Sequence, residues 1–145
     1  MVTSWYTKIN KLFYLLLINM AEEKKAKKVY TLDEIKFNEE NKAISIVSWI
    51  PIVGFIMLFV EKKDQFVRYV GAQVTIMALI SIALGIISPI IAFIPVLRLI
   101  MAPVIGLYSL AVFVCVIVGM VKTAKGERFD VPVITDWALK LMGMI

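Results

Sequence analysis

The chain has 145 residues, of which 61% are hydrophobic and 19% are charged, and its mean hydropathy is +0.87. This length allows one domain, and a water-soluble domain of this size could not bury so much apolar surface. The chain has no histidine, and its single cysteine, Cys115, lies in an apolar run, so we expect no disulfide framework, metal site or cofactor. The net charge of +5 is typical of basic flanks that contact lipid headgroups, and no nucleic-acid-binding fold fits between the apolar runs.

Residues 1–42 form a polar N-terminal region whose beginning has two open explanations. After Lys8 and Lys11, the apolar residues 12–18 are too few to cross a bilayer, and no small-residue cleavage site follows them. Residues 1–19 are therefore either a mis-assigned start, with translation beginning at Met20, or a short interfacial anchor.

A short interfacial helix is predicted at the end of this region. Thr31 and Glu34 have the spacing of a capping box, in which two side chains satisfy each other's free backbone N–H groups at a helix start. The helix would cover residues 32–42 and place Leu32 and Ile35 at the bilayer surface.

Three stretches are long and apolar enough to be transmembrane helices. The runs without any charge have 18, 29 and 23 residues, and they cover residues 43–60, 69–97 and 99–121. Runs of about 18 or more such residues are typical of membrane spans. We predict a transmembrane domain over residues 43–121, with spans at about 43–60, 69–87 and 101–121.

Prolines disturb this pattern in two places. Pro51 predicts a kink in the first span. Pro89 and Pro95 argue against a continuous helix through residues 88–100, which we expect to be re-entrant or interfacial, with Arg98 reaching the headgroups. The predicted fold is an all-α integral membrane protein with three transmembrane helices and this short segment, or alternatively with four transmembrane helices.

Charge and length disagree about the number of crossings. Counted from Met20, three crossings place seven Lys and Arg residues on each side, whereas four crossings give ten against four. The positive-inside rule therefore favours four crossings, with both ends in the cytoplasm. Residues 69–121 supply roughly 80 Å of helix, however, and three crossings within them would need more than about 90 Å, so length favours three in total.

Residues 122–145 are predicted to contact the membrane surface after the last span. They begin with a basic stretch that contains Lys125 and Arg128, and they continue into an amphipathic helix in which Trp137 lies on the apolar side. We expect Lys125, Arg128 and Trp137 to be membrane-surface contacts.

Small residues mark one side of the second predicted span. Gly71, Thr75, Ala78, Ile82 and Gly85 fall on one helical stripe, and small residues let helices approach closely in lipid. This stripe predicts helix packing.

Two motifs resemble a known family. Phe66-Val67-Arg68-Tyr69, followed by Gln73, resembles the F-V-R-[FY]-H-A-x-Q signature of small prokaryotic membrane proteins of uncharacterised function. The stretch Lys125-Gly126-Glu127-Arg128-Phe129, with Pro132, resembles the second mark of that family. The family is related to the twenty-kilodalton subunit of the chloroplast inner-envelope translocon. Val70 replaces the usual histidine, so no role of that histidine is carried over.

The resemblance covers roughly residues 40–142. It implies three or four transmembrane helices, no established enzymatic activity, and at most a part in moving polypeptides at a membrane. It also directs attention to Phe66, Arg68, Tyr69 and Gln73, which we expect to organise helix packing or a partner contact.

Three classes of function are weighed on the residues. An enzyme is not expected, because the carboxylates of residues 33–40 lie on one solvated surface and the membrane-depth hydroxyls have no base. A non-catalytic subunit or scaffold of a membrane assembly fits the spans and charged loops, with the lipid bilayer, further copies or other membrane subunits as partners. The alternative is an oligomeric channel or transporter component lined by the Gln73 face. The expected location is a prokaryotic plasma membrane.

Overall fold

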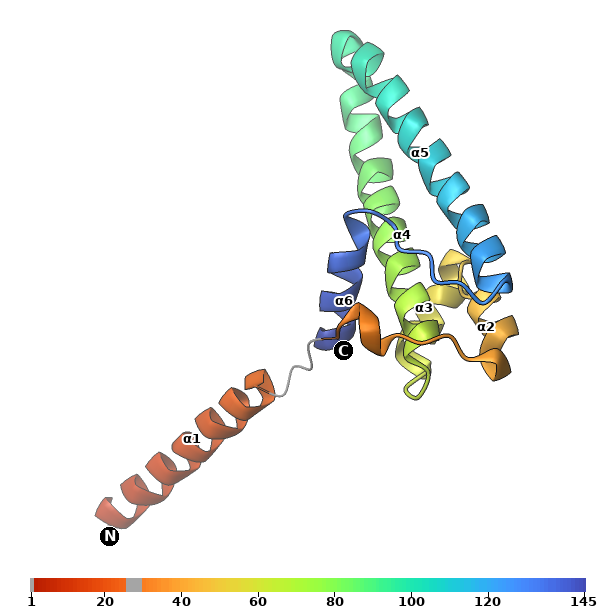
Figure 1. Cartoon of the computed structure of the whole chain (residues 1–145). Helices are drawn as coiled ribbons and strands as arrows, with labels where there is room; N and C mark the ends of the chain where they lie inside the picture. The colour runs from red at the N-terminus through yellow and green to blue at the C-terminus, as the bar shows by residue number, and fades with distance from the viewer. Residues whose placement is uncertain (1, 26–29) are drawn as a thin grey trace.

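The structure is a computed structural model that describes residues 2–25 and 30–145 (Figure 1). All regular secondary structure in these two ranges is helical. A hairpin of two long helices, α4 (Gln65–Ala92) and α5 (Pro95–Ala124), projects from a base formed by shorter helices. The base contains α2 (Lys42–Val47), α3 (Pro51–Val60) and α6 (Ile134–Met144).

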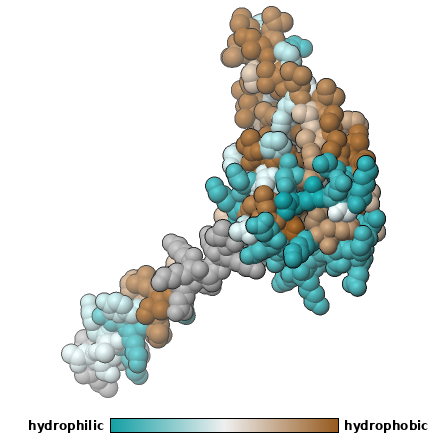
Figure 2. All heavy atoms as spheres, viewed as in Figure 1, coloured by the Kyte–Doolittle hydropathy of each residue, from teal (hydrophilic) through white to brown (hydrophobic). Residues whose placement is uncertain are grey.

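The two hairpin helices have the length and surface of membrane spans. At 1.5 Å per residue, their 28 and 30 residues extend about 42 and 45 Å, which exceeds the roughly 30 Å of a bilayer's hydrocarbon core. Only 22% of the most apolar window of α4 and 6% of that of α5 is buried, so neither is the core helix of a soluble protein. Figure 2 shows hydrophobic residues over the projecting hairpin and hydrophilic residues around the base.

The segment 88–100 differs from the expected re-entrant element. It contains the end of α4, a connection at Phe93 and Ile94, and the start of α5. Pro89 lies inside α4, and Pro95 occupies the first turn of α5, where a missing N–H costs no helical hydrogen bond. The spans predicted at 69–87 and 101–121 are therefore each longer at both ends.

The predicted first span is divided into two short helices. The backbone turns between α2 and α3 at residues 48–50, and Pro51 then begins α3. The turn is fixed by Trp49, which is fully buried and donates its indole N–H to Thr123 Oγ1 of α5 at 2.9 Å. Pro51 thus starts a helix instead of kinking one, and residues 43–60 do not form one 18-residue helix.

Two glycines let the base pack tightly against the hairpin. A Cβ atom on Gly71 of α4 would lie 2.5 Å from the carbonyl oxygen of Gly54 in α3. A Cβ atom on Gly119 of α5 would lie 2.4 Å from the ring of Trp49. Both distances are too short for a real Cβ atom, so α3 and Trp49 approach as closely as they do only because these residues are glycines.

The stripe of small residues is used at one end only. Gly71 packs against α3, and the hydroxyl of the buried Thr75 donates a hydrogen bond to the Gly71 carbonyl at 2.7 Å. A Cβ atom on Gly85 would meet nothing within 4 Å. The predicted packing face therefore covers the beginning of α4 and stops before Gly85.

The N-terminal region differs from its prediction beyond residue 30. The segment 32–42 forms two 3-10 turns, η1 (Leu32–Glu34) and η2 (Glu39–Asn41), in place of one interfacial helix. Thr31 precedes η1 but makes no capping hydrogen bond with its side chain. Ile35 has an extended backbone and is buried in the apolar core of the base.

Residues 1–19 fall largely within α1 (Val2–Lys25), whose described side chains are exposed. This helix is not among the candidate membrane spans of the described chain. A helix is compatible with an interfacial anchor, and the question of a start at Met20 stays open.

We predict that Gly71→Ala destabilises the protein, since the added methyl group would meet backbone atoms that cannot rotate away. Overpacking of this kind typically costs about 1–3 kcal/mol. Thermal unfolding in mild detergent, followed by circular dichroism, measures the effect. Gly85→Ala in the same helix is the matched control and should be neutral or slightly stabilising. Equal unfolding temperatures for the two variants would contradict the close contact of α3 with α4.

Candidate functional site

The first three turns of α4 are enclosed by chain segments that are far apart in sequence. We call residues 30–42, 61–64 and 125–145 together the collar, a definition that leaves out the apolar residues 43–60. Buried positions of α4 run without interruption from Phe66 to Met77. The collar therefore surrounds the stretch in which the first motif occurs, and it brings the two motif regions into contact.

Asp64 ties the beginning of α4 to the N-terminal part of the collar. Its Oδ1 atom accepts the backbone N–H groups of Phe66 and Val67, at 2.9 and 3.2 Å, and so caps the helix. Its Oδ2 atom accepts the side-chain amide of Asn41 at 2.8 Å, which fixes η2 beside the helix start. An aspartate before an apolar helix is a recognisable N-cap signal, but the partner Asn41 has no signal in the sequence.

Glu61 shapes the short connection from α3 to α4. Its carboxylate accepts the backbone N–H groups of Lys63 and Asp64, at 2.9 and 3.1 Å. These two hydrogen bonds to the charged form hold the pKa of Glu61 below its usual value. The connection therefore keeps its negative charge at neutral pH, next to Lys62 and Lys63.

Gln73 joins α4 to the C-terminal part of the collar. Its side chain is fully buried, its Nε2 donates to the Phe129 carbonyl at 3.1 Å, and its Oε1 accepts the Val131 N–H at 3.0 Å. One amide thus pairs with the backbone on both sides of Asp130, as a neighbouring β-strand would. The site predicted at Gln73 is a contact between the two motif regions of the same chain.

Tyr69, one turn earlier in α4, hydrogen-bonds to the side chain of Asp130, the residue between Phe129 and Val131. Its hydroxyl donates to Asp130 Oδ1 at 2.7 Å and lies 3.2 Å from Thr135 Oγ1 at the start of α6. Asp130 is also paired with Arg128, whose Nε lies 2.9 Å from Oδ1. Arg128 in turn donates to the Leu32 carbonyl, so both halves of the collar meet at this group.

Arg68 is a buried cation held by α6 and the N-terminal part of the collar. It is only 8% exposed, its Nη1 lies 3.2 Å from the Tyr30 hydroxyl, and its Nη2 lies 3.5 Å from the Met142 carbonyl. Met142 is in the last turn of α6, where free carbonyls and the helix dipole favour a positive charge. The guanidinium also lies 5.7 Å from the centre of the Tyr30 ring. Its Nε has no partner among the described residues.

Phe66 completes the predicted group as an apolar contact. It is fully buried and packs edge-on against Phe37, with ring centres 5.2 Å apart. The structure thus brings Phe66, Arg68, Tyr69 and Gln73 into one buried cluster. Sequence reasoning missed Asp130, Thr135, Trp49 and Thr123, because their partners lie more than sixty residues away in the chain.

The three predicted membrane-surface residues have different surroundings. Lys125 is exposed, and Trp137 on α6 is 51% exposed. Arg128 is partly buried and is engaged by Asp130 and Leu32, so it acts within the collar. Among the described residues, no three acidic or cysteine side chains lie close enough together to hold a metal ion.

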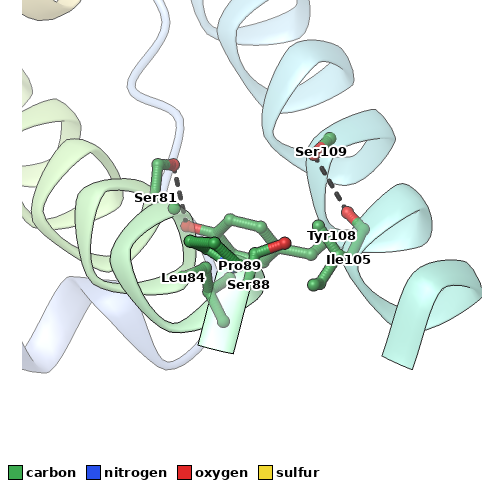
Figure 3. Close-up of a pocket in the computed structure, with 8 residues that line it drawn as sticks. Ser81, Leu84, Ser88, Pro89, Ile105, Tyr108 and Ser109 are labelled. Atoms are coloured by element: carbon green, nitrogen blue, oxygen red, sulfur yellow. Dashed lines mark hydrogen bonds between the residues drawn. The ribbon is translucent and has the colours of Figure 1, made fainter. Parts of the chain in front are cut away.

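A cavity of about 400 Å³ lies between α4 and α5 at membrane depth (Figure 3). Four hydroxyl groups line it, and those of Ser81, Tyr108 and Ser109 are hydrogen-bonded within the protein. Tyr108 donates to the Met77 carbonyl at 3.1 Å, while Ser81 and Ser109 donate to carbonyls in their own helices. The bond of Tyr108 joins α5 to α4, so three of the hydroxyl groups at the cavity are already used within the protein.

Two long, exposed apolar helices with a charged base define a helical membrane protein. Comparison with known proteins identifies its family. Residues 40–138 match the model of the magnetosome magnetite crystal formation protein family, and the chain belongs to this family. No solved structure matches the chain.

Three similar proteins are archaeal and are named UPF0132 membrane proteins. One from Methanocaldococcus jannaschii is 33% identical over 101 residues, 70% of this chain and 66% of that protein, so the match spans slightly less than two thirds of it. A second from this organism is 38% identical over 87 residues, 60% of this chain and 73% of the relative. One from Archaeoglobus fulgidus is 30% identical over 93 residues, 64% of this chain and 84% of the relative.

These matches support the resemblance as far as a membrane-protein family of unknown function. None of them connects the chain to the chloroplast translocon. The membrane location is supported by the relatives' names together with the apolar hairpin.

We predict that Gln73→Leu destabilises the protein, because it leaves the Phe129 carbonyl and the Val131 N–H unpaired in a buried site. Each unpaired group typically costs about 1–3 kcal/mol. Gln65→Leu is the matched control, since Gln65 Oε1 is buried without a partner and its removal should cost little. Unfolding temperatures in mild detergent compare the two variants. An unfolding temperature of Gln73→Leu that is no lower than that of Gln65→Leu would contradict this assignment.

We predict that Tyr69 and Asp130 act as a coupled pair. Tyr69→Phe and Asp130→Asn should each lower stability, and the double variant should lose less than the sum of the two losses. A double-mutant cycle of unfolding free energies measures the coupling. Tyr14→Phe, at an exposed tyrosine in α1, is a control that should change nothing. Additive losses would show that the 2.7 Å contact contributes no energy of its own.

Proposed function

We propose that the protein is a non-catalytic membrane scaffold, anchored by the α4–α5 hairpin and presenting the collar on one face of the membrane. The observation that carries this proposal is that the polar side chains buried on α4 are hydrogen-bonded within the protein. The side chains of Tyr69 and Gln73, which an enzyme or a pore would direct to a substrate, are hydrogen-bonded to Asp130 and to the backbone on either side of it. They build a rigid base and leave the collar's outer surface for contacts.

Charge supports a cytoplasmic collar. Ten Lys and Arg residues lie between residues 30 and 145, and nine of them belong to the collar or to the adjoining ends of α4 and α5. The tenth is Arg98, three residues after the start of α5 at the far end of the hairpin. With two crossings, the positive-inside rule therefore favours a cytoplasmic collar, with Arg98 near the opposite surface.

The absence of catalysis and the plasma-membrane location are parts of the same proposal. A narrower role in moving polypeptides would require the outer surface of the collar to bind an extended chain. Tyr69 and Gln73 of the first motif are occupied by contacts within the protein and so are not free for that role. The alternative, a channel component, is favoured by the cavity between α4 and α5, but three of the hydroxyl groups that line it are paired within the chain.

We predict that residues 36 and 63 lie on the cytoplasmic side and that residue 93 lies on the other side. Lys36→Cys, Lys63→Cys and Phe93→Cys, each in a Cys115→Ala background, can be labelled from either side with a membrane-impermeant maleimide. Three crossings, with residues 43–60 as a span, would place residue 36 with residue 93 and opposite residue 63. That result would contradict the two-crossing arrangement.

We predict that substitutions on the collar surface weaken partner contacts without affecting folding. Lys125→Glu and Trp137→Ser change exposed side chains, so capture from mild detergent should recover less partner, or less of a second copy, at an unchanged unfolding temperature. Met144→Ser, also exposed, serves as the control for loss of apolar surface. Recovery of no partner and no second copy even with the unaltered protein would contradict the scaffold.

A further inference from the structure

The α2–α3 segment has an apolar face that none of the residues described, 2–25 and 30–145, covers. Inward-facing Ser45, Ser48, Gly54 and Leu58 are buried against the hairpin. The opposite face consists of eight exposed apolar side chains, each between 39% and 74% exposed: Ile44, Val47, Ile50, Ile52, Phe55, Ile56, Phe59 and Val60. A soluble protein rarely exposes a contiguous apolar surface of this kind.

This segment is too short to cross a bilayer. The ten residues of α3 extend about 15 Å, half of the roughly 30 Å hydrocarbon core. The two ends of the segment are polar, since Lys42 begins α2 and the residues Glu61, Lys62 and Lys63 follow α3. The sequence is thus charged up to Lys42, uncharged through the turn at Trp49, and charged again from Glu61.

We propose that α2 and α3 form a monotopic element that inserts into the collar-side leaflet only, with the acyl chains of that leaflet covering its exposed face. Two observations choose lipid as the occupant. First, the exposed apolar face of α2 and α3 lies beside the exposed apolar surface of the α4–α5 hairpin. The lipid that surrounds the hairpin would therefore also cover this face. Second, its charged ends, with three lysines, suit the headgroups of the same leaflet.

This insertion makes the molecule a wedge across the membrane. Figure 1 shows α4 and α5 joined at the tip and diverging toward the base, where α2, α3 and α6 lie. The collar-side leaflet therefore accommodates α2 and α3 in addition to the two hairpin helices, while the other leaflet accommodates the hairpin alone. A helix inserted in one leaflet expands it relative to the other, and such binding is sensitive to curvature. The protein consequently favours membranes whose collar-side leaflet is convex.

Insertion depth tests the first part of this proposal. Nitroxide labels on Ile52→Cys and Ile86→Cys, in a Cys115→Ala background, report accessibility to oxygen in the bilayer and to an aqueous nickel complex. Both original side chains are exposed, Ile52 of α3 at 74% and Ile86 of α4 at 64%. We expect both labels to contact acyl chains, with residue 52 closer to the surface than residue 86.

Two results would overturn the insertion while leaving the spanning hairpin intact. One is a label at residue 52 that is as accessible to the nickel complex as a label on Lys63→Cys, with residue 86 still deep. The other is dipolar broadening between labels at residue 52, which would mean that a second copy covers the face.

Vesicle curvature tests the second part. The protein is reconstituted with the collar outward, and its density per lipid is compared between small sonicated and large extruded vesicles of one lipid composition. We expect enrichment on the small vesicles, and we expect Ile52→Ser with Phe55→Ser to abolish it at an unchanged unfolding temperature. Met144→Ser with Ile145→Ser, on exposed apolar residues outside this face, should keep the enrichment. Equal densities for the unaltered protein, or enrichment retained in the Ile52 and Phe55 variant, would overturn the wedge.

Discussion

The hydrogen bonds of Gln73 are the interaction on which the rest of the base depends. A fully buried amide in an apolar helix is costly unless both its donor and its acceptor are paired. Here the partners are the carbonyl of Phe129 and the N–H of Val131, in a segment with no secondary structure of its own to satisfy them. The same two bonds therefore satisfy the side chain and fix the path of the chain between α5 and α6.

Once that path is fixed, the neighbouring contacts have definite partners. Asp130 lies between the two bonded backbone groups, so its carboxylate is presented to Tyr69 one turn away and to Arg128. Val133 then has a positive φ of 68°, a rare conformation for a β-branched residue, and α6 begins at the next residue. Helix α6 ends with its carbonyls near Arg68, which gives a buried guanidinium a favourable partial charge.

Local signals in the sequence predicted the helical membrane class. The family resemblance directed attention to four residues that the structure buries on α4, namely Phe66, Arg68, Tyr69 and Gln73. Charge-free runs identify apolar helices, and a glutamine one turn into such a run requires a partner. The identity of that partner was not predictable, since Phe129 and Val131 contribute only backbone atoms. The break at residues 48–50 was missed for a related reason. Pro51 alone is compatible with a kink, and only the buried contact of Trp49 with Gly119 and Thr123 makes the chain turn.

The disagreement between charge and length depends on whether residues 43–60 are a span. If they cross, the ends of the chain are separated and the basic residues divide evenly, which a membrane protein with a defined orientation rarely shows. If they enter and leave the same leaflet, all basic residues beyond residue 30 except Arg98 share one side, and the hairpin needs only the two crossings that its length allows. On the proposed arrangement with two crossings, the burial of Trp49 at the break between α2 and α3 thus reconciles the charge distribution with the length of the chain.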